Sequence, residues 1–201
     1  YLNGSRDHLT VVVGDVSGKG TSAALYMSKV QGILRSLHGF GLSPADLFIR
    51  ANRLLCGDME KSSFVTAVGA TFDPAARSFI LARAGHLPLY HFKAAERQVV
   101  SITPRGLGLG LNNAGVFTSE IEEKVVPYGP GDVMLFVTDG VIEAHSRGGE
   151  LFGEERLMEV LSGRAAGSAA AIRDAVIREL AAFSEGADQH DDETIVVIKG
   201  S

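Results

Sequence analysis

The chain is 201 residues long, which fits one large domain or two small ones. Its 19 basic and 24 acidic residues give a formal net charge of −5, which argues against nucleic-acid binding because contacts to a phosphate backbone need clustered cations. Hydrophobic residues make up 45% and charged residues 21%, which argues against global disorder. No apolar run approaches the roughly 18 residues that a membrane span requires, so we expect none.

The single cysteine, Cys56, excludes an intramolecular disulfide framework and fits a reducing cytosol, so we expect a cytoplasmic protein. The 24 glycines indicate tight turns or sites lined by backbone. No repeat or Pro/Ser-rich linker divides the sequence, so we predict one domain over residues 1–201. The chain starts at Tyr1 and reads as part of a longer protein.

The first half of the chain predicts one strand followed by two helices. A strand is expected over residues 9–13 and a helix over 19–37, where apolar residues recur at spacings of three and four. That apolar stripe consists of Ala23, Met27, Val30, Leu34 and Leu37. A second helix opens at Ser43-Pro44 and extends to about residue 57, with Ser43 as N-cap, Pro44 at the first helical position and Asp46 completing a capping box.

Hydrophobic residues then alternate with a period of two. The alternation predicts strands over residues 64–72 and 78–84 in a hairpin, two short strands over 89–93 and 98–102, and a half-exposed strand over 116–126. In the last of these, Phe117, Ile121 and Val125 are expected on one face. A glycine-rich loop is expected over residues 104–113.

The remaining elements are two strands that flank two helices. Residues 133–137 and 194–198 are apolar on both faces and predict covered strands. The helices are expected near residues 154–161 and 168–183. Paired helices at both ends of a block of strands indicate an α+β layered sandwich.

Acidic residues border three of the apolar strands. Asp15 follows the first strand, Asp139 follows residues 133–137, and Asp191 with Asp192 precedes the final strand. If these strands are neighbours, the carboxylates converge and require a proton or a cation. A set of oxygen ligands favours Mg²⁺ or Mn²⁺, and two such ions can activate water against a phosphate. Taken singly, each Asp fits a helix cap or a turn better than a metal ligand, but taken together with their sequence contexts the acids favour a metal site.

Six short motifs occur in order along the chain: GDVSGKG at residues 14–20, AGHLP at 84–88, LGL at 107–109, FVTDGVIEA at 136–144, GELFG at 149–153 followed by Arg156-Leu157, and DDET at 191–194. The ordered set resembles the metal-dependent serine/threonine phosphatases of type 2C. More narrowly, it resembles the bacterial branch typified by the stage II sporulation phosphatase and the phosphatases that regulate sigma factors.

This resemblance implies a four-layer α-β-β-α sandwich with two central, mainly antiparallel sheets. It also implies two Mn²⁺ or Mg²⁺ ions. Asp15 would be the bridging ligand, the Val16 carbonyl a backbone ligand, and Asp139 and Asp191 ligands of the second ion. Metal-activated water would then hydrolyse phosphoserine or phosphothreonine without a covalent phosphoenzyme.

Two features depart from the family pattern. The usual G-G-D-x-x-D element does not occur before Leu9, where residues 4–7 suit a hairpin turn. Either the first strand lies upstream of this chain, or one metal site is incomplete. Ser17 stands where animal-type members carry a His, so a His general acid is not supported there. Lys19 is a candidate phosphate contact, or a solvated charge. For His86 a structural hydrogen bond is favoured over catalysis, and His190 could contact metal-bound water or lie at the surface.

By the same resemblance, the substrate would be a phosphorylated regulatory protein of the anti-sigma-factor-antagonist type. The partners would include an upstream sensor or receiver domain, and a homodimer is plausible. Two other functions compete with this one. The first is a nucleotide-binding P-loop protein, which the spacing excludes. Three residues separate Gly14 from the Gly-Lys pair, whereas a P-loop has four. The second is a catalytically inactive phosphatase-like domain that binds a partner protein, and this alternative remains open.

Overall fold

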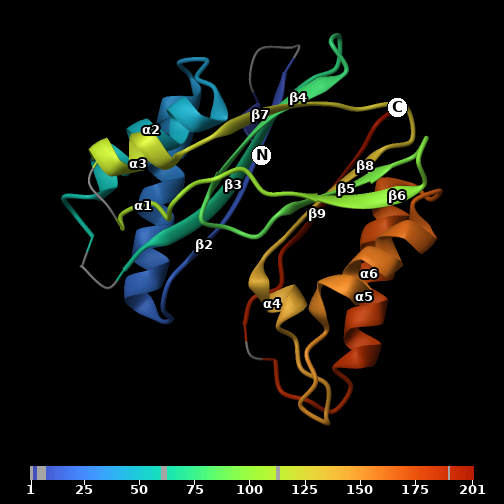
Figure 1. Ribbon diagram of the computed structural model, residues 1–201. Helices are drawn as coiled ribbons and strands as arrows, with labels where there is room; N and C mark the ends of the chain where they lie inside the picture. The colour runs from blue at the N-terminus through green and yellow to red at the C-terminus, as the bar shows by residue number, and fades with distance from the viewer. Residues whose placement is uncertain (1, 4–7, 60–62, 112–113, 190) are drawn as a thin grey trace. The chain divides into compact units, whose positions relative to one another are not determined.

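The chain forms two compact units in a computed structural model (Figure 1). The structure describes residues 2–3, 8–59, 63–111, 114–189 and 191–201. Unit 1 comprises residues 1–86 and 103–127, and unit 2 comprises residues 87–102 and 128–201. Each unit contains one antiparallel sheet with its own helices, so the predicted α+β class with two antiparallel sheets is confirmed.

The sheet of unit 1 has the strand order β1-β2-β3-β4-β7, and every pair is antiparallel. Its strands are β1 (Leu2–Asn3), β2 (Leu9–Val16), β3 (Val65–Asp73), β4 (Ser78–Ala84) and β7 (Glu123–Pro127). β3 and β4 form the predicted hairpin, in which the Asp73 carboxylate accepts a hydrogen bond from the Ala76 amide at 2.9 Å.

The helices that the structure describes in unit 1 are α1 (Thr21–His38), α2 (Pro44–Leu55) and α3 (Ala114–Glu120). α2 begins as predicted, because Ser43 Oγ accepts a hydrogen bond from the Asp46 amide at 3.3 Å. The Glu123 carboxylate of β7 accepts a second one, from the Ala45 amide at 2.8 Å. Fully buried Phe48 of α2 lies in the core between helices and sheet.

The sheet of unit 2 has the strand order β6-β5-β8-β9, again antiparallel throughout. Its strands are β5 (Leu89–Lys93), β6 (Gln98–Ile102), β8 (Val133–Val137) and β9 (Ile195–Lys199). All five residues of β8 are buried, as the apolar run predicted. The carboxylate of Asp132, just before β8, accepts hydrogen bonds from His91 Nε2 at 2.9 Å, the Ala94 amide at 2.8 Å and the Gly129 amide at 3.0 Å.

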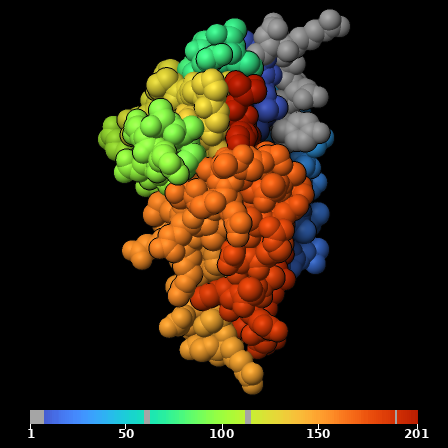
Figure 2. All heavy atoms as spheres, turned by 90° about the vertical axis from the view of Figure 1, so that its right-hand side faces the viewer, coloured from blue at the N-terminus to red at the C-terminus, as the bar shows by residue number. Residues whose placement is uncertain are grey.

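The helices of unit 2 are α4 (Asp139–Ile142), α5 (Gly153–Arg164) and α6 (Ala169–Phe183). α5 and α6 pack against each other and on the sheet, and Figure 2 shows their exposed side in orange to red. Their buried residues Leu157, Leu161 and Ile172 share one core with Leu135 and Val137 of β8. Lys199 Nζ donates hydrogen bonds to the carbonyls of Ala165 and Gly167, at 2.8 and 2.6 Å, and so caps the end of α5.

Several element predictions were wrong in detail. The strand expected over residues 116–126 is a helix, α3, followed by the shorter strand β7. Phe117, Ile121 and Val125 are spaced by four residues, a spacing that suits a period of two and a helical turn alike. Phe117 is fully buried, whereas Val125 is 70% exposed.

Three further corrections concern burial and strand length. β2 continues to Val16, so Asp15 lies inside a strand instead of following it. β9 is the edge strand of its sheet and is half-buried, although its sequence is apolar on both faces. Met27 of the predicted α1 stripe is 37% exposed, whereas Val30 and Leu34 of that stripe are buried.

None of the helices in the described part of the chain combines the length and the hydrophobicity that a membrane span requires.

Candidate metal centre

The first candidate ligand segment is the end of β2. Val12 and Val16 pack toward the helices of unit 1, so strand alternation places Asp15 on the opposite face of the sheet. Asp15 is half-buried and lies directly across from Thr66 of β3. Arg83 of β4 lies on this same face, since its neighbours Ala82 and Ala84 contribute to the helix-side core.

The turn that follows β2 is held against β3. The Ser17 amide donates to the Phe64 carbonyl at 2.9 Å, and Ser17 Oγ accepts from the Phe64 amide at 2.8 Å. Ser17, at the position where a His general acid was not supported, therefore anchors the turn. Lys19 is exposed just before α1, whose N-cap Gly20 offers no side-chain cap and whose first turn contains no acid.

The second candidate segment joins the end of β8 to the residues before β9. Thr138, 4% exposed, donates through Oγ1 to the Asp192 carbonyl at 3.0 Å and accepts from the Thr194 amide at 2.9 Å. A backbone hydrogen bond of 3.2 Å also runs from the Thr138 amide to the Thr194 carbonyl. One buried hydroxyl thus links the segment of Asp139 to the segment of Asp191.

Gly140 allows these two segments to approach closely. A Cβ at this position would lie 2.4 Å from the Asp192 carbonyl oxygen, a contact that no side chain tolerates. Asp139 Oδ1 accepts from the Gly140 amide at 3.0 Å, and Asp191 Oδ1 accepts from the Asp192 amide at 2.9 Å. Asp139 is half-buried and Asp191 is exposed. The structure therefore brings the segments of these two predicted ligands together.

The predicted ligands are divided between the two compact units. Asp15 and Val16 belong to unit 1, whereas Asp139 and Asp191 belong to unit 2. Within the ranges that the structure describes, no group of three or more His, Cys, Asp or Glu residues is arranged to hold a metal ion. His190 lies outside the described residues. The convergence of all these acids therefore stays a prediction.

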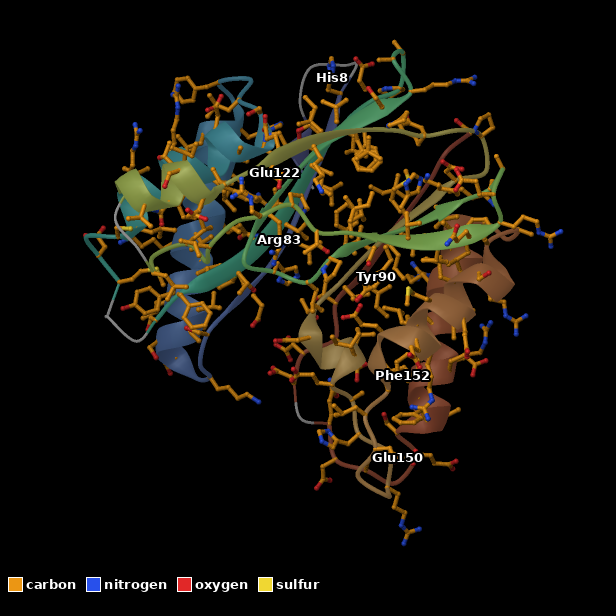
Figure 3. The ribbon with its side chains drawn as sticks, viewed as in Figure 1. His8, Arg83, Tyr90, Glu122, Glu150 and Phe152 are labelled. Carbon is orange, nitrogen blue, oxygen red and sulfur yellow. The ribbon has the colours of Figure 1, made fainter. Side chains whose placement is uncertain are left out.

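Sequence reasoning missed three residues that support the candidate segments: Thr66, Arg83 and Thr138. Arg83, labelled in Figure 3, donates from Nε to the Pro104 carbonyl at 2.9 Å and from Nη1 to the His86 carbonyl at 2.7 Å. Burial lowers the pKa of the Arg83 guanidinium. Thr138 lies inside a recognised motif, but Thr66 and Arg83 carried no pattern that could have indicated their hydrogen bonds.

The glycine-rich loop lies against these residues of unit 1. A Cβ on Gly106 would lie 1.7 Å from the Arg83 carbonyl oxygen, so only glycine fits there. Leu109 exchanges backbone hydrogen bonds with Val65, and the Gly110 amide donates to buried Asn52 at 2.8 Å. The excess of glycine predicted backbone-lined segments, and this loop is one of them.

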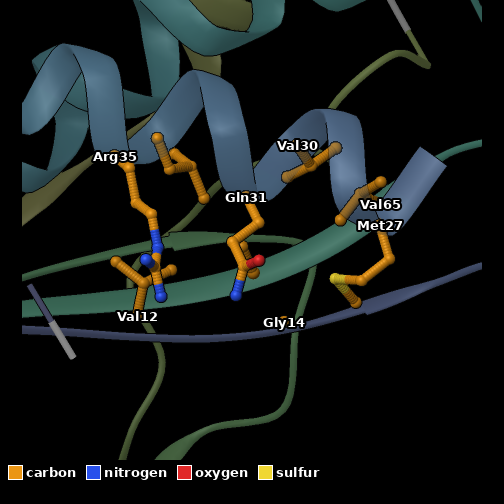
Figure 4. A pocket seen from close by; sticks show the side chains of 9 residues that line it. Val12, Gly14, Met27, Val30, Gln31, Arg35 and Val65 are labelled. Atoms are coloured by element: carbon orange, nitrogen blue, oxygen red, sulfur yellow. The ribbon is translucent and has the colours of Figure 1, made fainter. Parts of the chain in front are cut away.

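A hollow of about 170 Å³ lies in unit 1 between α1 and the strands β2 and β3 (Figure 4). Val12 and Gly14 line it on β2, and Met27, Gln31 and Arg35 line it on α1. Since Gly14 faces this hollow, the side chain of Asp15 points to the other face of the sheet. The hollow is therefore separate from the candidate metal ligand.

Solved structures show the class of this fold. The SiaA PP2C domain of Pseudomonas aeruginosa superposes with a TM-score of 0.85 at 20% identity, over 98% of this chain and 78% of that one. RsbX, solved in complex with magnesium, gives a TM-score of 0.71 at 13% identity, over 98% of this chain and 83% of that one. The chain has the fold of PP2C-type phosphatase domains.

The sequence comparison identifies the family. Residues 5–200 match the family described as Stage II sporulation protein E (SpoIIE), and the chain belongs to it. Phosphoserine phosphatase RsbU of Bacillus subtilis is 27% identical over 149 residues, which cover 73% of this chain and 42% of RsbU. The chain thus spans less than half the length of this curated relative.

Proposed function

We propose that this chain is the catalytic domain of a metal-dependent phosphatase that hydrolyses phosphoserine or phosphothreonine on a protein. The observation that carries the proposal is the linked pair of segments in unit 2, where Thr138 holds the Asp139 turn against the residues after Asp191. Membership of the SpoIIE family and similarity to phosphoserine phosphatase RsbU support the reaction type.

The donor atoms of the candidate ligands fit a hard divalent cation. Asp15, Asp139 and Asp191 offer carboxylate oxygens and Val16 a backbone carbonyl, the donors that Mg²⁺ and Mn²⁺ prefer. We propose that these four residues hold two such ions, with Asp15 shared between them. The ions would supply charge neutralisation at the phosphate and a water of lowered pKa. The solved magnesium complex of RsbX supports this choice of cation.

The residues of this chain would do the positioning. Thr138 and Gly140 hold the two acidic segments of unit 2 close together. The free-energy cost of bringing these carboxylates together would therefore be paid by folding and not by metal binding. Ser17 anchors the turn after Asp15 to β3. Lys19, exposed at the uncapped start of α1, is our candidate for contact with the anionic substrate.

The physiological substrate and the protein context belong to the same proposal. The motifs that resemble the sigma-factor-regulating branch lead us to propose a phosphorylated regulatory protein of the anti-sigma-factor-antagonist type as substrate. Similarity to phosphoserine phosphatase RsbU supports a phosphoserine as the group that is hydrolysed. We propose that residues 1–201 act as one phosphatase domain, completed by residues upstream of β1 that carry a further acidic ligand. We also propose that it acts in the cytoplasm within a longer protein that carries a sensor or receiver domain and forms a homodimer.

The test is hydrolysis of a phosphoserine peptide by the full-length protein in the presence and absence of Mn²⁺. We expect Mn²⁺-dependent phosphate release that a chelator abolishes, and loss of turnover in Asp139→Asn with an unchanged circular dichroism spectrum. Asp174→Asn, an exposed acid of α6 paired with Arg173, is the matched control and should keep full activity. Failure to release phosphate, with tight binding to a phosphoprotein retained, would favour the inactive binding module.

A further inference from the structure

His86 is a buried residue that the proposed reaction does not use. It follows β4 in the AGHLP motif and is 5% exposed. Its Nδ1 lies 2.9 Å from Thr66 Oγ1, so the ring and the hydroxyl share a hydrogen bond in either tautomer. The sequence predicts a structural hydrogen bond for His86. The partner in this bond, Thr66, connects His86 to the surroundings of a candidate metal ligand.

Thr66 is the cross-strand neighbour of Asp15. The two residues face each other in the antiparallel register of β2 and β3. Side chains in such a pair lie on the same face of the sheet, with Cβ atoms about 4.5–5.5 Å apart. The Thr66 hydroxyl therefore belongs to the immediate surroundings of the Asp15 carboxylate. Its hydrogen bond to His86 restrains the rotamer of Thr66 and so the position of the hydroxyl oxygen.

His86 is itself held from two directions. Arg83 donates to the His86 carbonyl at 2.7 Å and, with a second nitrogen, to the glycine-rich loop at Pro104. The preceding Gly85 has φ of 72°, and a Cβ there would lie 2.8 Å from the Gly108 amide nitrogen. The sheet and the loop therefore hold the backbone from which the His86 ring extends.

We propose that His86 is a positioning residue that acts through Thr66 on the metal-ligating carboxylate of Asp15. The inference rests on the proposed function, in which Asp15 holds divalent cations. Carboxylates that bind metals are oriented by hydrogen-bonding groups around them, and loss of such a group costs about 10–100-fold in metal affinity or activity. The hydrogen bonds that connect Arg83, His86 and Thr66 would supply this orientation on the sheet face that carries Asp15.

The experiment measures Mn²⁺ binding by calorimetry, together with hydrolysis of p-nitrophenyl phosphate, in the full-length protein. Thr66→Val removes only the hydroxyl, and His86→Leu removes the ring nitrogens. We expect each to weaken Mn²⁺ binding by about 10–100-fold. The double variant should be no weaker than the more affected single variant, because both changes break one hydrogen bond. His86→Asn, which keeps a polar atom near the place of Nδ1, should recover most of the affinity.

Thr71→Val is the matched control. Thr71 lies on the same strand β3, and its hydroxyl bonds Thr10 of β2 at 2.9 Å, so this variant loses a hydroxyl from the same sheet away from Asp15. It should bind Mn²⁺ like the wild type. Unchanged Mn²⁺ affinity in Thr66→Val and His86→Leu would overturn the proposal, as would an equal loss in Thr71→Val.

The two measurements separate this inference from the proposed function. A wild-type protein that binds Mn²⁺ but hydrolyses no phosphoester contradicts the phosphatase, while the binding comparison still decides the role of His86. A wild-type protein that binds no Mn²⁺ contradicts both. Thermal unfolding of each variant shows whether it is folded. If His86→Leu does not fold, the Mn²⁺ affinity of Thr66→Val decides the proposal, because that change is nearly isosteric and lies at a half-buried position.

Discussion

Single buried polar groups organise the segments that carry the candidate ligands. The Thr138 hydroxyl acts as both donor and acceptor between residues more than fifty positions apart. Leaving a buried donor or acceptor without its partner costs about 1–3 kcal/mol. Thr138 therefore holds together the two segments that carry the candidate ligands Asp139 and Asp191.

We predict that Thr138→Val lowers the free energy of unfolding by about 1–3 kcal/mol, because the Asp192 carbonyl and the Thr194 amide lose their shared partner. We also expect Mn²⁺ affinity to fall, since the segments of Asp139 and Asp191 separate more easily. Urea unfolding and calorimetry measure the two effects. Thr138→Ser, which keeps the hydroxyl, should match the wild type in its free energy of unfolding and its Mn²⁺ affinity. Equal losses in Thr138→Ser and Thr138→Val would contradict the role of the hydroxyl.

The buried pair of His91 and Asp132 predicts a dependence of stability on pH. Burial of the Asp132 carboxyl favours its neutral form, but hydrogen bonds from the Gly129 and Ala94 amides and from His91 outweigh burial and lower its pKa. A carboxyl with a lowered folded-state pKa stabilises fully above the pKa of the unfolded chain, about 3.9. This stabilisation is lost as the pH falls through the lower folded-state value.

We therefore predict that the wild type loses more stability than Asp132→Asn when the pH falls from about 5.5 to 3. At neutral pH, Asp132→Asn should be less stable by about 1–3 kcal/mol because the charged acceptor of three hydrogen bonds is gone. Urea unfolding at a series of pH values checks both statements. Parallel stability curves for the two proteins would show that Asp132 does not titrate with unfolding.

At the scale of elements, the ends of helices depend on residues from distant strands. α5 ends where Lys199 of β9 donates to the carbonyls of Ala165 and Gly167. Such carbonyls have no partner within the helix, and a cation near them is favourable. The contact therefore joins α5 to the edge strand of the unit 2 sheet.

We predict that Lys199→Met destabilises the protein by about 1.5–3 kcal/mol, the range for hydrogen bonds to a charged group. Methionine keeps the apolar stem of the side chain, so the loss reports the ammonium group. Lys93→Met is the control, because the exposed ion pair of Lys93 with Glu96 should contribute less than about 1 kcal/mol. Thermal or urea unfolding measures the difference, and equal losses in both variants would contradict the capping role.

At the scale of the whole molecule, the proposed ligands are divided between two compact units. If one pair of ions is shared, binding must stabilise both units together. Mn²⁺ at about 100 times its dissociation constant should then raise the free energy of unfolding by about 2.7 kcal/mol.

We predict that Asp15→Asn and Asp139→Asn each abolish most of this stabilisation, although they lie in different units. Calorimetric unfolding with and without Mn²⁺ measures the shift in Tm for each variant and for the wild type. Independent sites would give a different result, because each single variant would then keep the contribution of the other unit. A wild-type protein whose Tm does not respond to Mn²⁺ would contradict a metal centre of any kind.

The sequence by itself determined the class of fold, the family resemblance and most strand and helix positions, because apolar periodicity and capping residues are local properties. The cap of α2 at Ser43 and the buried strand β8 are examples. Tertiary structure decided what depends on neighbours distant in sequence. It placed β9 at a sheet edge, and it made hydrogen-bonded partners of Thr138 with Thr194 and of His86 with Thr66. No local pattern encodes these pairs, since they arise only when the strands align in register.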